Sequence, residues 1–163
     1  MPRLFLERSE RAVRLLLEKT VVVLLSAIAV ICFVEVVLRY GFGRSFGWYD
    51  EFTGYLLVWL TFLGAVLAQQ QGRHIGVENL FERLGRQGRR LLMLFVQALL
   101  IAIHLVLLAY GSQLVARFLS DRAITLPVPM GIVYLVIPLS AALMLSVQVM
   151  AVTRLLRKPS TES

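Results

Sequence analysis

The sequence predicts an all-α integral membrane protein with four transmembrane helices and both termini in the cytoplasm. Three observations predict this fold: 58% of residues are hydrophobic and only 17% are charged, four long uncharged runs occur, and each run approaches the ~20 residues that one helical crossing needs. The net charge is +7, but the basic residues fall between the apolar runs. That distribution suits contact with membrane lipid headgroups and excludes a nucleic-acid-binding face, which needs clustered basic residues.

The predicted spans cover residues 20–38, 52–70, 91–115 and 132–152. Between them lie a stretch rich in glycine and aromatic residues (39–49), a highly charged stretch (72–90), and a stretch with charges and two prolines (117–129). Residues 1–158 are expected to form one membrane domain, followed by a polar tail at 159–163. We interpret the first apolar run as a retained span, because a long N-terminal stretch of mixed charge precedes it.

The distribution of Lys and Arg orients the helices. Residues 1–19 carry five, 71–90 carry five and 154–158 carry three, against Arg39, Arg44, Arg117 and Arg122 in the other connections. Cytoplasmic segments are enriched in basic residues. The termini and the middle connection are therefore predicted to be cytoplasmic.

Two cytoplasmic segments are predicted as amphipathic surface helices at residues 3–18 and 77–88. In the second, Val77, Leu80, Phe81 and Leu84 recur at helical spacing, with charged residues between them. Such helices lie in the headgroup layer of the membrane. For residues 3–18, a simple extension of the first span is an equally good interpretation.

Four charged residues are expected near the outer ends of the first two spans. Asp50 and Glu51 occupy the first turn of the second span, where free backbone N–H groups and the helix dipole favour acids. Glu35 and Arg39 are spaced i, i+4 and can pair on one helix face. A structural or subunit contact is the main interpretation, and an ion or substrate contact is the alternative.

No pattern indicates catalysis, a cofactor or a metal site, so we expect a protein that is not an enzyme. His74 lies just beyond the second span, whereas His104 lies 13 residues into the third, so their depths differ by roughly 20 Å at ~1.5 Å per residue. Because one haem cannot easily use both, His104 is expected to pack between helices.

Small residues four apart predict close helix contacts in the second and third spans. Gly64 with Ala68 and Ala98 with Ala102 have this spacing. Trp59 and Phe62 lie at a different angle, for which contact with lipid or a partner is the alternative. Ordinary packing within the chain is the main interpretation of all these residues.

Several short motifs, taken in order, resemble the small integral-membrane subunit of tripartite ATP-independent periplasmic (TRAP) transporters. They are "LRYGF" at 38–42, Trp48 with Asp50 and Glu51, "YLLVW" at 55–59, "FLGA" at 62–65, "HIGV" at 74–77, Pro129, Tyr134 and Pro138. The resemblance covers nearly the whole chain. One departure is Gly54, where the family commonly has an arginine.

The resemblance implies a non-enzymatic subunit of a secondary transporter in the inner membrane of a bacterial or archaeal cell. It implies a large permease subunit bound about 1:1 and a periplasmic substrate-binding protein, with an ion gradient, usually sodium, driving uptake of organic acids such as C4-dicarboxylates. The candidate structural or subunit-contact residues are Glu35, Arg39, Trp48, Asp50, Glu51, Trp59, Gly64, His74, Tyr134 and Pro138.

Two other classes of protein share some of these features. A self-sufficient small multidrug exporter also has four spans and depends on a carboxylate in its first helix, for which Glu35 would be the candidate. A membrane anchor of a redox complex would use the two histidines, whose unequal depths disfavour it.

Overall fold

The computed structural model describes residues 2–70 and 85–157. Its helices are α1 (Pro2–Phe42), α2 (Tyr49–Gln70), α4 (Arg86–Phe118), α5 (Met130–Tyr134) and α6 (Val136–Arg157). Four stretches are long and apolar enough to cross a membrane: Arg11–Phe42, Tyr49–Gln70, Leu91–Phe118 and Met130–Met150. The described residues form no β-strand beyond one isolated bridge, so the predicted all-α membrane fold is confirmed. His74 and most of the predicted surface helix at 77–88 lie outside the described residues.

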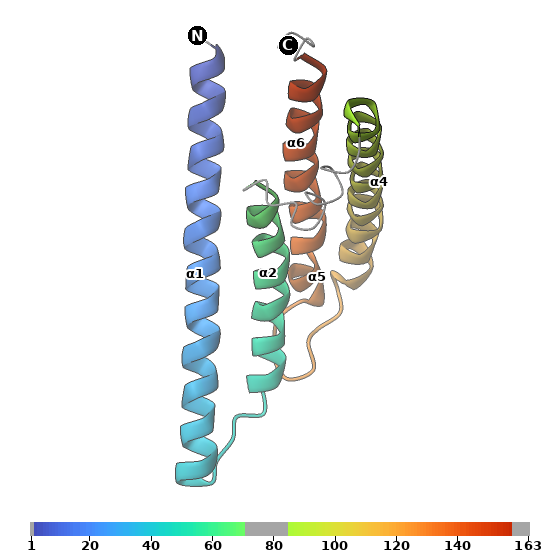
Figure 1. Ribbon diagram of the computed structural model, residues 1–163. Helices are drawn as coiled ribbons and strands as arrows, with labels where there is room; N and C mark the ends of the chain where they lie inside the picture. The colour runs from blue at the N-terminus through green and yellow to red at the C-terminus, as the bar shows by residue number, and fades with distance from the viewer. Residues whose placement is uncertain (1, 71–84, 158–163) are drawn as a thin grey trace.

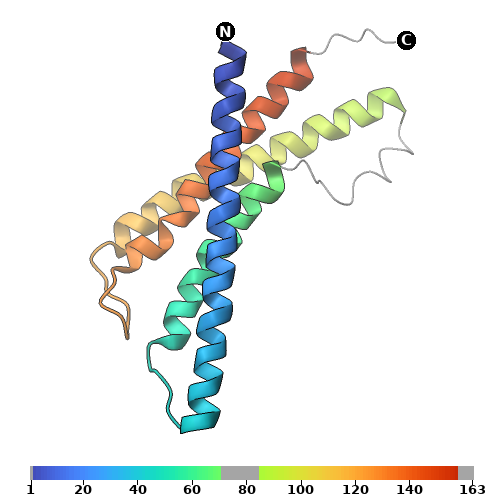
Figure 2. The ribbon, with the colours of Figure 1, turned by 90° about the vertical axis from the view of Figure 1, so that its left-hand side faces the viewer.

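The long helices stand side by side in the order α1, α2, α6, α4 (Figure 1). Helix α1 packs on α2, α2 on α6, and α6 on α4. Figure 2 shows α4 and α6 side by side near the α4–α5 connection and diverging toward their other ends, and both cross α1 at an angle. The start of α1 and the end of α6 lie at the same end of the helices, the upper end in Figure 1, which we call the terminal end. The α1–α2 and α4–α5 connections lie at the other, the connection end.

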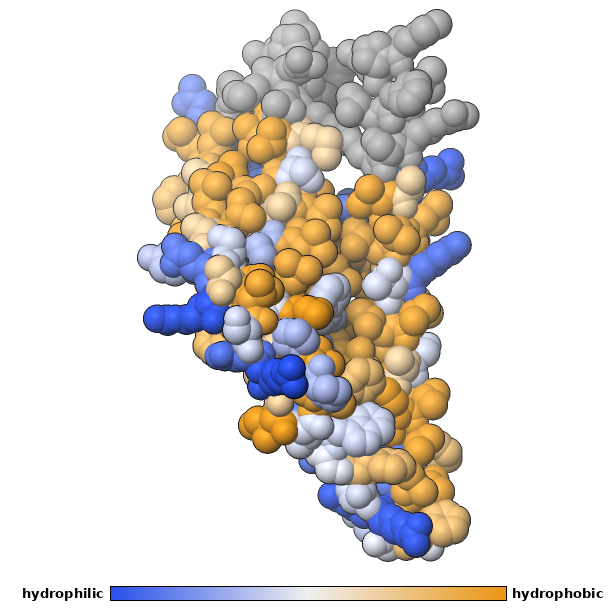
Figure 3. Space-filling model, turned by 180° about the vertical axis from the view of Figure 1, so that it is seen from behind, coloured by the Kyte–Doolittle hydropathy of each residue, from blue (hydrophilic) through white to orange (hydrophobic). Residues whose placement is uncertain are grey.

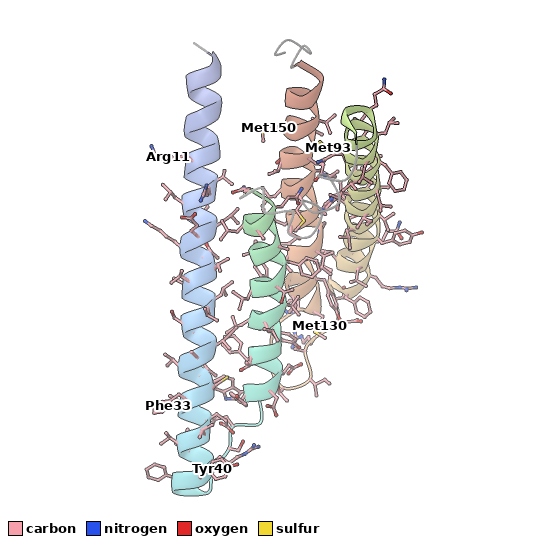
Figure 4. All side chains as sticks on the ribbon, in the orientation of Figure 1. Arg11, Phe33, Tyr40, Met93, Met130 and Met150 are labelled. Atoms are coloured by element: carbon pink, nitrogen blue, oxygen red, sulfur yellow. The ribbon has the colours of Figure 1, made fainter. Side chains whose placement is uncertain are left out.

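Helix α1 is continuous over 41 residues, or roughly 61 Å at ~1.5 Å per residue. Residues 3–18 therefore extend the first span as one helix, which is the second of the two interpretations above. Arg14 Nε donates to Glu18 Oε1 at 2.8 Å on this extension. The outward side of α1 is apolar, and Phe33, labelled in Figure 4, projects away from the other helices and is 70% exposed.

The apolar core joins α1, α2 and α6. Its buried members are Leu17, Leu63, Val66, Val136 and Met144. Trp59 and Phe62 pack against these residues. This agrees with packing within the chain, the main interpretation above, and follows because α2 has neighbours on both sides.

A chain of three glutamine side chains links α2, α6 and α4. Gln69 Nε2 donates to Gln148 Oε1, and Gln148 Nε2 donates to Gln97 Oε1 at 2.5 Å. Gln148 is only 2% exposed. Since a buried amide costs free energy unless it is hydrogen-bonded, this chain specifies which three helices meet and at what register.

His104 packs between helices, as expected. It is 5% exposed on α4, and its Nε2 lies 3.0 Å from Met144 Sδ on α6. Its Nδ1 has no hydrogen-bond partner in the described part of the chain. His104 thus contributes to the contact between α4 and α6.

Glycines at two positions allow the closest backbone approaches. A Cβ on Gly111 would lie 2.9 Å from Ile137 Cγ2 and 3.1 Å from Pro138 Cδ, and one on Gly131 would lie 2.8 Å from Leu119 Cα. A Cβ on Gly64, by contrast, would meet nothing within 4 Å, and Ala68, Ala98 and Ala102 are exposed. The spacing rule therefore chose the wrong small residues for contacts within this chain.

Pro138 also explains why α5 and α6 are separate helices. Leu135 N–H donates to Gly131 O at 3.0 Å and Leu139 N–H donates to Leu135 O at 3.2 Å. Pro138 has no N–H, so the carbonyl of Tyr134 lacks its usual helical donor. The break falls at Leu135, while the Tyr134 ring packs edge-on against Phe118 with centroids 5.5 Å apart.

We expect Gly111→Ala to lower the stability of the protein. Overpacking against rigid neighbours costs about 1 to 3 kcal/mol, which exceeds the ~0.5 to 1 kcal/mol gained by removing a helical glycine. Thermal unfolding of the purified protein in detergent measures the effect. Gly64→Ala is the matched control, because its new methyl group enters open space, and it should leave the midpoint unchanged or raise it. A Gly111→Ala protein as stable as the control would contradict the close approach of α4 and α6.

Candidate functional site

The candidate site lies at the connection end, where Glu35, Arg39, Asp50 and Glu51 were expected to form one cluster. The structure instead divides them between two separate carboxylate sites, one at Glu35 and one at Glu51. Arg39 and Asp50 are exposed and belong to neither. Among residues 2–70 and 85–157, Arg14 and Glu18 form the one ion pair with an N–O distance below 4 Å. The expected ion pair between Glu35 and Arg39 therefore does not form.

Glu51 binds the distant α4–α5 connection. Its Oε1 accepts the N–H of Ile124 at 2.8 Å, and its Oε2 accepts both the N–H of Thr125, at 2.7 Å, and the Thr125 hydroxyl. The Tyr55 hydroxyl, one helical turn along α2, donates to Oε1 at 2.5 Å. An ionised carboxylate accepts about four hydrogen bonds and donates none, so these four donors occupy it fully.

The connection that Glu51 holds is a short hairpin over residues 119–129. Arg122 and Pro129 form an antiparallel bridge. Ala123 N–H donates to Val128 O at 3.0 Å, and Met130 N–H donates to Asp121 O at 2.8 Å. Its tip therefore has two anchors, its own backbone pairs and the Glu51 carboxylate.

Tyr55 ties the same region to α5. Its hydroxyl oxygen lies 3.2 Å from Met130 Sδ, at the first residue of α5, which Figure 4 labels beside α2. Glu51 thus joins α2 to the tip of the hairpin, and Tyr55 joins α2 to the start of α5.

Glu35 forms the second carboxylate site, between α1 and the connection that follows it. The side chain is 3% exposed and accepts hydrogen bonds from the Ser45 hydroxyl and, more weakly at 3.5 Å, from Phe46 N–H. Gly43 ends α1 with φ of +62°, a conformation that glycine adopts without strain. The connection can then fold back so that Ser45 reaches Glu35.

Aromatic residues pack around the start of α2. The Trp48 ring stacks on Phe46 with centroids 5.5 Å apart and meets Phe52 edge-on at 5.8 Å. The Tyr49 hydroxyl lies 3.3 Å from Cys32 Sγ on α1. These contacts fix the entry into α2, from which Glu51 projects.

Glu51 has its hydrogen-bond donors although this chain has Gly54 where the family commonly has an arginine. The glycine is exposed and a Cβ on it would meet nothing within 4 Å. Glu51 already has its four uncharged donors, so it needs no arginine at this position. Sequence reasoning missed these donors, since Ile124 and Thr125 are 73 and 74 residues away and no local pattern marks them.

We expect Glu51→Gln to loosen the hairpin without unfolding the helices. A glutamine side chain has one acceptor oxygen, and its NH2 group would face hydrogen-bond donors. Some of the four donors that now bind Glu51 would therefore lose their acceptor. Hydrogen exchange across residues 120–128 should become several-fold faster. Asp50→Asn is the matched control, because it removes a charge one residue away on an exposed side chain. Equal exchange rates in the two variants would contradict the role given to Glu51.

Comparison with known proteins identifies the family. Residues 28–158 match the family described as tripartite ATP-independent periplasmic transporters, DctQ component. A Haemophilus influenzae protein provisionally named a TRAP transporter small permease is 33% identical over 119 residues, covering 72% of this chain and 73% of that protein.

Two further relatives match over shorter shares of their length. The ectoine TRAP transporter small permease TeaB of Halomonas elongata is 31% identical, over 64% of this chain and 55% of its own. The C4-dicarboxylate TRAP transporter small permease DctQ of Rhodobacter capsulatus is 29% identical, over 63% of this chain and 46% of its own. With most of its length matched and four membrane-spanning helices in its fold, the chain belongs to the DctQ family of TRAP transporter small permease subunits.

Proposed function

We propose that this subunit is a non-catalytic scaffold that holds a large permease subunit in the inner membrane. One observation carries the proposal: the most buried polar side chains are used for contacts within the chain. Of the described residues, the buried polar or charged side chains are Glu35, His104, Ser140 and Gln148. Each contacts another group of the chain. A substrate path would need free polar groups gathered along it. The buried side-chain atoms without a hydrogen-bond partner in the described part of the chain are Thr53 Oγ1, Gln70 Oε1 and His104 Nδ1, and Thr53 and Gln70 lie near opposite ends of α2.

The exposed apolar surface of the edge helices α1 and α4 also supports a scaffold role. Large apolar side chains are exposed along both edge helices, among them Val22, Leu25 and Phe33 on α1 and Leu91, Phe95 and Leu99 on α4. Figure 3 shows hydrophobic residues over most of the rear face. Such surfaces are stable only against lipid or the apolar helices of another membrane protein.

As part of this proposal, the large permease binds about 1:1, carries the substrate and uses an ion gradient, with sodium as the expected ion. A periplasmic binding protein delivers an organic acid to the pair. The family membership supports this arrangement. Related small permeases are named for ectoine and for C4-dicarboxylate transporters, which supports placing substrate choice on the other components.

The multidrug-exporter alternative loses its main support in the structure. An exporter of that kind needs a carboxylate that is free to exchange a proton with its cargo. Glu35 is instead tied to Ser45 and Phe46 of the connection that follows its own helix. That arrangement favours a structural role for Glu35.

The test is co-purification from native membranes with a tag on the C-terminal tail. We expect a large, many-span permease in near-equal amount, and uptake of an organic acid that depends on both subunits and on an ion gradient when they are reconstituted with the binding protein. A homo-oligomer without such a partner, or drug efflux by this chain alone, would overturn the proposal.

The proposed orientation places the terminal end in the cytoplasm. In a Cys32→Ala background, a single cysteine at Ser120 should react with a membrane-impermeant maleimide on intact cells. A cysteine at Arg11 should react only after the membrane is permeabilised. Both positions are exposed, so access to the reagent decides the result. The reverse labelling pattern would invert the topology.

A further inference from the structure

Met130 lies where the α4–α5 hairpin meets α2. It is the first residue of α5, and its side chain is partly exposed. Its Sδ lies 3.2 Å from the Tyr55 hydroxyl oxygen, and the same hydroxyl contacts Glu51 Oε1 at 2.5 Å. Oxidation converts a methionine thioether into a sulfoxide, which turns an apolar side chain into a polar one. Met130 is therefore a candidate modification site beside the hydrogen bonds that hold the hairpin.

The Tyr55 hydroxyl has one proton and two neighbouring acceptors. It can donate a single hydrogen bond, and a thioether sulfur accepts only weakly. The proton therefore points to the Glu51 carboxylate, whose charge makes it the stronger acceptor, and Met130 Sδ is only in contact with the hydroxyl oxygen. A sulfoxide oxygen on Met130 accepts hydrogen bonds far better than the sulfur does. After oxidation, Met130 and Glu51 compete for the same proton.

The place of Met130 in the fold distinguishes it from the other described methionines. Met144 is only 8% exposed and belongs to the core. Figure 4 labels Met93 and Met150 toward the terminal end and Met130 toward the connection end. In the proposed orientation, on which this inference rests, Met130 is the one of these four residues that lies near the outer surface. An oxidant outside the cell membrane meets it first.

We propose that Met130 is a reversible oxidation site that controls how firmly Glu51 holds the hairpin. Hydrogen peroxide removes two electrons from the sulfur: an S–O bond forms, the O–O bond breaks, and water leaves. The Tyr55 hydroxyl then donates to the sulfoxide oxygen, and Glu51 loses one of its four donors. The three donors from the hairpin remain. Methionine sulfoxide reductases reverse the step, since a dithiol is oxidised to a disulfide while the oxygen leaves as water.

The test treats the full chain in lipid nanodiscs with hydrogen peroxide. Mass spectrometry measures oxidation at each methionine, and hydrogen exchange measures the protection of the Ile124 and Thr125 amides, which bind Glu51 directly. We expect Met130 to be oxidised before Met144. Exchange at the two amides should then become roughly fivefold faster, because the carboxylate that holds them has lost a hydrogen bond. Treatment with both types of methionine sulfoxide reductase should restore the original rate.

Three variants identify the cause of the change. Met130→Leu has a similar volume and no sulfur to oxidise, so peroxide should leave its exchange rates unchanged. Met93→Leu is the matched control at the terminal end and should respond as the unmodified protein does. Tyr55→Phe lacks the shared proton. Its two amides should exchange faster from the start, and oxidation of Met130 should add no further increase.

Oxidation of Met130 without faster exchange at Ile124 and Thr125 would overturn the inference. An equal response to peroxide in Met130→Leu, or oxidation of Met144 before Met130, would overturn it as well. The measurement needs no large permease, so its result is separate from the scaffold proposal. A subunit that passes this test but does not co-purify with a large permease contradicts the scaffold alone.

Discussion

The hydrogen bonds to the Glu51 carboxylate are the constraint on which the connection end depends. One side chain in the first turn of α2 binds two backbone amides and a hydroxyl from a hairpin more than 70 residues later in the sequence, together with the hydroxyl of Tyr55. The hairpin in turn sets where α5 begins, through Met130 N–H and Asp121 O. Because these four uncharged donors already occupy the carboxylate, the contact requires no arginine. This explains how the chain accommodates Gly54.

Away from the Glu51 carboxylate, the helices are held together by different chemistry. Lipid is as apolar as the helix surfaces, so polar contacts and close backbone approach have to specify helix pairing there. The glutamine chain through Gln148 and the contact between His104 and Met144 provide the polar contacts. Gly111 provides the close approach. All of these involve α6, which therefore organises the row although it is the last helix in the sequence.

Hydropathy predicted the four spans because each helix carries enough apolar surface to be recognised without knowledge of its neighbours. It did not predict the order α1, α2, α6, α4, since helix order depends on contacts such as Gln69 with Gln148 between residues far apart in sequence. The i, i+4 spacing suggested a local pair of Glu35 with Arg39, whereas Glu35 accepts a hydrogen bond from Ser45, which reaches it because the chain turns back at Gly43. The spacing of small residues found Gly64 and missed Gly111, because spacing alone does not show which face of a helix meets a partner.

If this subunit is the scaffold of a large permease, as proposed, it should itself keep one shape during transport. The most direct measurement is a pulsed electron spin resonance distance between labels at Gly47 and Ser120, two exposed positions in the two connections, in a Cys32→Ala background within the assembled transporter. The account predicts a single distance distribution that is unchanged by substrate, binding protein and ion gradient. A second distance population that appears during transport would show that the connection end moves, and would contradict the scaffold role.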